Sequence, residues 1–170
     1  MKTEFGDDPA QPLLFNGYQS GGVEFAVVFN DDNLTAQTKR DELDALVQAA
    51  VTAESGALPG AFVEIVTIGH ADRDDTPGRT PEQRRQVELD NSGLRAESAE
   101  SFLFNKIAEQ LLAEGATVPA DVASLQSVEM RRVAAGSADL VFTAPGNDEG
   151  ERKANRRVQF FGTAFTAPAP

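Results

Sequence analysis

The 170-residue sequence contains no cysteine, no tryptophan and a single histidine, His70. Without cysteine, the chain has no disulfide framework, no thiolate zinc site and no cysteine nucleophile. Any Ser-His-Asp triad or histidine metal site would have to use His70. A chain of this length can bury an adequate core without cross-links, so we expect one domain with tails.

Basic residues and long apolar runs are also scarce. The chain has 15 Lys and Arg against 27 Asp and Glu, a net charge of −12. Such a charge disfavours binding to nucleic acid and to anionic membrane surfaces. The apolar runs at residues 25–29 and 62–68 are too short to span a bilayer. Residues 1–8 lack an apolar stretch and carry acids, so we expect no signal peptide there.

Apolar periodicity predicts an α+β fold, a two-layer sandwich with the order β-α-β-α-β-(α)-β and helices on one face of a mixed sheet. The stretch at residues 61–69 is apolar at nearly every position, which indicates a central strand. The expected strands are residues 22–29, 61–69, 128–133 with an extension through 140–142, and 157–161; the expected helices are 35–55, 91–114 and 148–154.

Composition also divides the chain into segments. Residues 1–21 are polar and predict an irregular N-terminal arm, residues 22–162 form the expected domain, and residues 163–170 are a Pro/Ala tail. Residues 70–90 carry many charges and few apolar side chains, so we expect this loop to be the most mobile internal segment. Pro145-Gly146-Asn147 predicts a turn.

Three short motifs lie at the boundaries of the expected elements. Residues 68–72 read Ile-Gly-His-Ala-Asp, residues 92–96 read Ser-Gly-Leu-Arg-Ala, and residues 155–158 read Asn-Arg-Arg-Val. Taken together and in this order, they resemble the Gly-x-Thr-Asp, Ser-x-x-Arg-Ala and Asn-Arg-Arg-Val motifs of the OmpA-like peptidoglycan-binding family. The resemblance extends over residues 22–162.

The resemblance implies a non-catalytic domain of the bacterial periplasm or outer-membrane envelope that binds peptidoglycan and anchors a protein or assembly to the cell wall. In that family an Asp and an Arg hold diaminopimelate, and these roles fall on Asp72 and Arg95. The chemistry fits, because a carboxylate accepts from an ammonium and a guanidinium holds a carboxylate through two hydrogen bonds. We expect both side chains at the rim of the domain, and no cofactor.

Departures from the family pattern favour an alternative. Ala71 replaces the usual Thr, and Glu88 stands where the family often has Asn. Together with Arg157, they are secondary candidates for ligand contact, although an arginine in this strand also suits an ion pair with a neighbouring element. The alternative is an OmpA-like structural domain that has lost its ligand and belongs to a larger envelope or secretion assembly, in the cytoplasm or on a particle.

Simpler interpretations compete with each candidate. Asp72 can terminate a strand, Arg95 can be a solvated helix residue, and Asn155 can close the turn into the last strand. His70, Asp72 and Asp74 alternate as metal ligands can, but one histidine with two loop carboxylates is common by chance. We therefore expect no metal. The sequence contains no phosphate-binding loop or nucleophile elbow, which predicts that the protein is not an enzyme.

Overall fold

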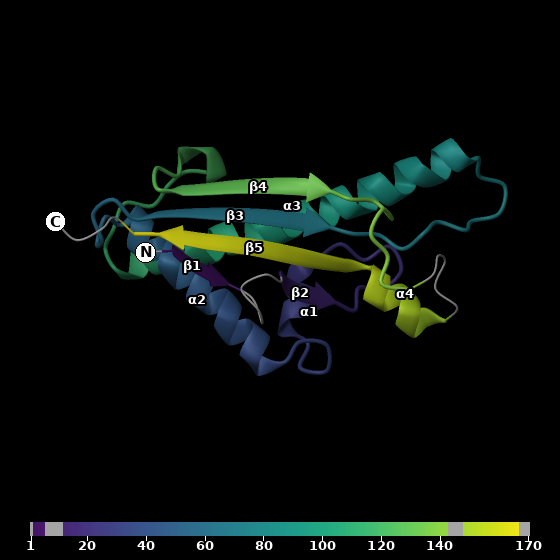
Figure 1. The fold of residues 1–170 in the computed structure, drawn as a ribbon, viewed down its shortest axis with the longest axis horizontal. Coiled ribbons are helices and arrows are strands. Elements are labelled where there is room, and N and C mark those ends of the chain that lie inside the picture. The colour runs from purple at the N-terminus through teal and green to yellow at the C-terminus, as the bar shows by residue number, and fades with distance from the viewer. Residues whose placement is uncertain (1, 6–11, 143–147, 167–170) are drawn as a thin grey trace.

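The computed structural model describes residues 2–5, 12–142 and 148–166 (Figure 1). Its elements are β1 (Lys2–Phe5), β2 (Leu13–Asn16), α1 (Phe25–Asn30), α2 (Gln37–Glu54), β3 (Phe62–Gly69), α3 (Pro81–Ala113), the 3-10 turn η1 (Val122–Ser124), β4 (Val128–Ala134), α4 (Glu149–Asn155) and β5 (Arg157–Phe165).

The strands form one mixed, five-stranded sheet. β3 lies between β4, to which it is parallel, and β5, to which it is antiparallel. The other edge of β5 is paired antiparallel with β1 and then with β2, which follow each other along it. The predicted α+β class and the interior position of β3 are therefore confirmed.

Helices cover one face of this sheet, and the core lies between the two layers. Along β3, Val63, Ile65 and Thr67 are buried, whereas the residues that alternate with them are only partly covered. Figure 1 shows α3 running behind the sheet, with its N-terminal end projecting beyond the strands. Aromatic rings of α1, β2 and their neighbours pack together, with centroids of contacting rings 4.8–6.1 Å apart: Phe15, Phe25, Phe29, Phe102 and Phe160. Each such pair adds about 0.5–1.5 kcal/mol beyond the burial of its area.

The strand predicted at residues 22–29 is wrong, because the structure has α1 at this place. Alternating Val and Phe suggested a strand, but the buried residues are Phe25, Val28 and Phe29, which are spaced as on one face of a helix. A short apolar run satisfies both periods, and only its neighbours decide between them.

In place of the strand expected at residues 22–29, the sheet has strands from the segment that was predicted to be an irregular arm. Within residues 1–21, β1 and β2 both pair with β5, and Leu13 and Phe15 of β2 point into the core at 1% exposure each. Four residues are too few for a clear alternating pattern, so β2 has little signal in the sequence.

Three further boundaries differ from the prediction. α3 begins at Pro81, so the second half of the expected loop at residues 70–90 is helical. No strand follows β4 at residues 140–142, and β5 continues to Phe165, into the predicted tail. α4 confirms the short helix. The turn expected at residues 145–147 and the end of the tail, residues 167–170, lie outside the described residues.

Candidate functional site

The first two motifs meet where α3 crosses the end of β3. A Cβ atom on Gly69 would lie 1.9 Å from the backbone oxygen of Ser92, so only glycine allows this approach. The buried Ser92 hydroxyl accepts a hydrogen bond from Gly136 N at 2.9 Å, and Gly136 O accepts one from Ala71 N at 2.7 Å. Gly69 of the first motif and Ser92 of the second thus hold the ends of β3 and β4 against one turn of α3.

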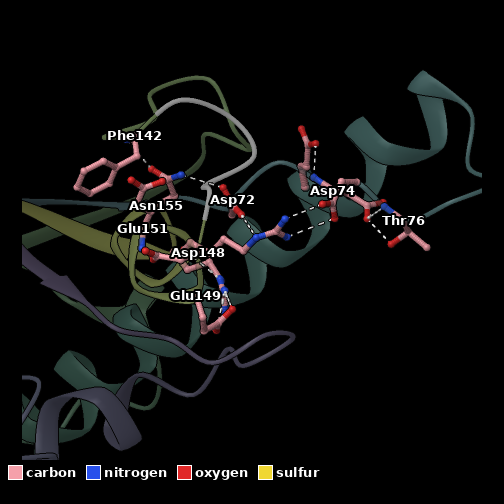
Figure 2. A network of polar contacts seen from close by, with 12 residues as sticks. Asp72, Asp74, Thr76, Phe142, Asp148, Glu149, Glu151 and Asn155 are labelled. Atoms are coloured by element: carbon pink, nitrogen blue, oxygen red, sulfur yellow. Dashed lines mark hydrogen bonds and ion pairs between the residues drawn. The ribbon is translucent and has the colours of Figure 1, made fainter.

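Asp72 follows this junction, and its carboxylate is almost covered. Its side chain is 7% exposed, and Oδ1 accepts a hydrogen bond from Asn155 Nδ2 at 2.8 Å (Figure 2). Asn155 is completely buried, and its Oδ1 accepts from the backbone N–H groups of Val141 and Phe142. The third motif therefore orients Asp72. The other oxygen, Oδ2, lies 3.9 Å from Arg152 Nε.

Arg95 is buried, at 1% exposure, which corrects the expected position at the rim. Nε donates to Gly22 O at 2.9 Å and Nη1 donates to His70 O at 2.8 Å. Its Cζ lies 5.1 Å from the centre of the Tyr18 ring, a cation–π contact. Arg95 forms no ion pair with any described carboxylate, and Nη2 has no hydrogen-bond partner within the described chain.

Burial lowers the pKa of Arg95 to about 10, whereas Tyr18 and Asp72 raise it in part. The guanidinium is therefore charged at neutral pH in spite of its burial. Burial likewise raises the pKa of the Tyr18 hydroxyl, so the ring beside Arg95 is neutral. A buried cation without a paired anion is costly, because the low-dielectric surroundings replace its water. An anion that enters beside Arg95 would offset this cost.

Asp72 and Arg95 line the same polar pocket, which has a volume of about 150 Å³. We call it the clamp pocket; it is lined by Ser20, Gly21, residues 71–76, Val87, Glu88, Asn91, Arg95, Arg152 and Arg156. Four carboxylates and four guanidinium groups contribute to this lining, so its formal charges balance. A balanced pocket with a fixed acid and a fixed base suits a zwitterion better than an ion of one sign.

The secondary candidates have different places. Ala71 lines the clamp pocket, but its methyl group supplies no hydrogen bond. Glu88 also lines it, although its carboxylate already accepts from Asp74 N at 2.8 Å and from the Ser137 hydroxyl. Arg157 is outside this lining and is bound by Asp139 at 2.9 Å, which is the ion pair considered from the sequence.

Three residues of the site had no role predicted for them from the sequence, and a fourth, Asn155, has a different role from the one predicted. Tyr18 lies against Arg95, and Arg152 holds Asp75 through two bonds, the shorter 2.6 Å. Asn155, expected only to close a turn, orients Asp72. Asn91 lines the clamp pocket, and its side chain makes no hydrogen bond with the described part of the chain. Only the Asn-Arg-Arg-Val motif signalled any of these contacts.

His70 takes part in the fold near the site. Its Nε2 lies 2.7 Å from Gln159 Oε1, and burial followed by the charge of Arg157 lowers its pKa. Within residues 2–5, 12–142 and 148–166, no three His, Cys, Asp or Glu side chains come together as a metal site would need. None of the helices in these ranges is long and apolar enough to cross a membrane.

No protein-family model matches this sequence, and no curated protein does. Solved structures do match. The periplasmic domain of Helicobacter pylori MotB is 18% identical over 94% of this chain and 85% of that chain, with a TM-score of 0.34. The cell wall anchor of the T6SS from Pseudomonas aeruginosa is 20% identical over 75% of this chain and 68% of that chain, with a TM-score of 0.32.

A third match is the peptidoglycan-associated lipoprotein from Burkholderia pseudomallei, 20% identical over 79% of this chain and 84% of that chain, with a TM-score of 0.33. The α+β architecture predicted from apolar periodicity is present in the structure itself. What the clamp pocket binds is inferred from its own residues.

Proposed function

We propose that this chain is a non-catalytic, OmpA-like domain of the periplasm or cell envelope that binds peptidoglycan. It anchors the protein or assembly to which it belongs to the cell wall. In this proposal the clamp pocket holds the free amino-acid end of diaminopimelate, with the ligand ammonium at Asp72 and the ligand carboxylate at Arg95.

The burial of Arg95 without a paired anion carries the proposal. Two backbone carbonyls fix the guanidinium through Nε and Nη1, and Nη2 remains for a ligand. A carboxylate placed against Nη1 and Nη2 would make two parallel bonds and would neutralise the buried charge. Asp72, held by Asn155, supplies the acceptor for an ammonium in the same pocket. The two ends of the ligand therefore meet opposite charges in one orientation only.

One observation favours the alternative, an interaction domain without ligand. Arg152 Nε stands 3.9 Å from Asp72 Oδ2, where a ligand ammonium would be bound. If Arg152 compensates Asp72 permanently, the clamp pocket is closed and the domain serves as a subunit of a larger envelope or secretion assembly.

Co-sedimentation with purified sacculi separates the two functions. We expect wild-type protein to sediment with sacculi that contain diaminopimelate and much less with sacculi that contain lysine, because lysine offers an ammonium without the carboxylate. Asp72→Asn and Arg95→Lys should each weaken binding about tenfold or more, since each loses a charge-assisted bond of about 1.5–3 kcal/mol. Lysine cannot reproduce the planar, bidentate geometry of Arg95.

The matched controls are Asp41→Asn and Arg131→Lys, exposed positions outside the clamp pocket. Both should bind as wild type does. Because Arg95 is buried, the thermal unfolding of each variant is measured first, and binding is compared where all variants are folded. Equal sedimentation of wild type, Asp72→Asn and Arg95→Lys would exclude the clamp pocket as the binding site and favour the ligand-free alternative.

A further inference from the structure

A second and larger pocket shares Arg73 and Glu88 with the clamp pocket. It has a volume of about 610 Å³ and lies between the first turns of α3 and the segment after β4. We call it the arginine pocket, after Arg73, Arg84 and Arg85 in its lining. It exists because α3 begins at Pro81 and continues past the end of the sheet, as Figure 1 shows.

The charge of the arginine pocket differs from that of the clamp pocket. Three guanidinium groups and one carboxylate contribute to its lining, in a chain whose net charge is −12. The carboxylate is Glu88, which is already bound by Asp74 N and Ser137. The arginine pocket is therefore a local cationic site on an acidic protein, and it suits an anion.

Two of its arginines have unused hydrogen-bonding capacity. Arg73 is exposed and makes no hydrogen bond or ion pair with any described residue. Arg84 donates from Nη2 to Thr76 O at 3.3 Å, whereas its Nε is buried and has no partner in the described chain. Arg85 is held by the exposed Glu82 at 3.0 Å. Arg73 and Arg84, which both line the pocket, thus carry donors that no described residue uses.

The two pockets are adjacent. Arg73 and Glu88 contribute to the lining of both, so one extended molecule can occupy them together. The rest of the arginine pocket is largely aliphatic, with Pro81, Leu89 and Ala138 in its wall. Short aliphatic groups that carry a carboxylate, as in a small peptide, match this combination of apolar wall and guanidinium rim.

We infer that the arginine pocket binds a carboxylate of the same stem peptide whose amino-acid end occupies the clamp pocket. This inference rests on the proposed function and extends it, because the ligand then becomes a peptide with two anionic contacts. Arg73 and Arg84 hold the second carboxylate, and Glu88 forms the wall between the two contacts. The specificity of the domain would depend on groups of the peptide outside diaminopimelate.

Calorimetric titration with two synthetic peptides tests the inference. The first is L-Ala-γ-D-Glu-meso-diaminopimelate, and the second is the same tripeptide with its carboxylates amidated except at the free amino-acid end. We expect wild-type protein to bind the first about tenfold more tightly than the second. In Arg73→Gln/Arg84→Gln the two affinities should become equal, at the level of the amidated peptide.

Arg73→Gln alone should lose part of the difference. It removes no hydrogen bond or ion pair within the described chain, so its thermal unfolding, measured alongside, should match that of wild type. Arg131→Gln, which makes the same charge change on β4, should behave as wild type. Equal binding of both peptides by wild-type protein would overturn the inference and leave the proposed function intact. Binding of neither peptide would overturn the proposed function, and the inference with it.

Discussion

The two halves of α3 bury side chains of opposite chemistry. In the C-terminal half, Leu103 and Ile107 are fully buried in the apolar core. In the N-terminal half, the buried residues Ser92 and Arg95 are polar, and each is at most 1% exposed. Apolar side chains need only close packing, whereas each buried polar group needs a partner. Under the proposed function, α3 therefore has one stabilising end and one binding end, and its donors without a partner in the described chain, on Arg84 and Arg95, lie at the binding end.

The largest effect is expected at Phe15, a core residue of β2. Phe15→Ala should lower the free energy of unfolding by about 3–5 kcal/mol, because it removes a buried ring from the aromatic cluster. Urea denaturation measures it. Phe161→Ala, on the open face of the sheet at 41% exposure, is the matched control and should change stability by less than about 1 kcal/mol. A small effect at Phe15 would mean that residues 1–21 are an arm outside the domain.

The next effect tests the stabilising end of α3 itself. Leu103→Ala should cost about 2–5 kcal/mol, while the exposed Leu112→Ala on the same helix should cost little. Sacculus binding, measured where the protein is folded, should be unchanged in both variants. Loss of binding in folded Leu103→Ala would show that the two halves of the helix are coupled.

A smaller loss of stability is expected at Asn155, at the end of α4, which orients Asp72 in the clamp pocket. Asn155→Ala leaves two backbone N–H groups and Asp72 without their partner, which should cost about 1–3 kcal/mol. Binding of sacculi should fall by more than this stability loss explains, since Asp72 is no longer oriented. The exposed Asn105→Ala is the control. Normal binding by Asn155→Ala would mean that Asp72 needs no support.

The smallest effect is a loosening of the loop after β3 in acid. Burial alone would raise the pKa of Asp74, but hydrogen bonds from Thr76 and Arg79 lower it from 3.8 to about 2. A hydrogen bond from Arg152 likewise lowers the pKa of Asp75. Because the folded-state pKa values are depressed, this stabilisation is present above the unfolded value of 3.8 and is lost as the pH falls toward about 2.

Amide exchange across this pH range measures the loosening. Amides at residues 72–76 should lose protection before those of α2, whose buried face is apolar. If both segments lost protection together, the loop would be part of the cooperative core, and the contrast between the two ends of α3 would not extend to it.

The start of α3 shows how a signal in the sequence can be overlooked. Thr80 and Gln83 form a capping box with bonds of 3.3 and 2.9 Å, and Pro81 follows the cap. Thr-Pro-Glu-Gln is a typical N-terminal helix signal, but the charges around it predicted a loop. The arginine pocket depends on this early start of α3, so the sequence interpretation did not predict the pocket either. β2 and α1 differ, since their few apolar residues are compatible with more than one structure.

The sequence by itself determined the parts of this protein that depend on local patterns. β3, α2 and the course of β4 follow from apolar periodicity, and three short motifs predicted that Asp72 and Arg95 lie together, as they do in the lining of the clamp pocket. The tertiary structure decided which charges are buried and which donors remain unused. Arg95 is held by Gly22 and His70, both far from it along the chain. The sequence around these residues cannot reveal such contacts, because every residue carries the same backbone acceptor.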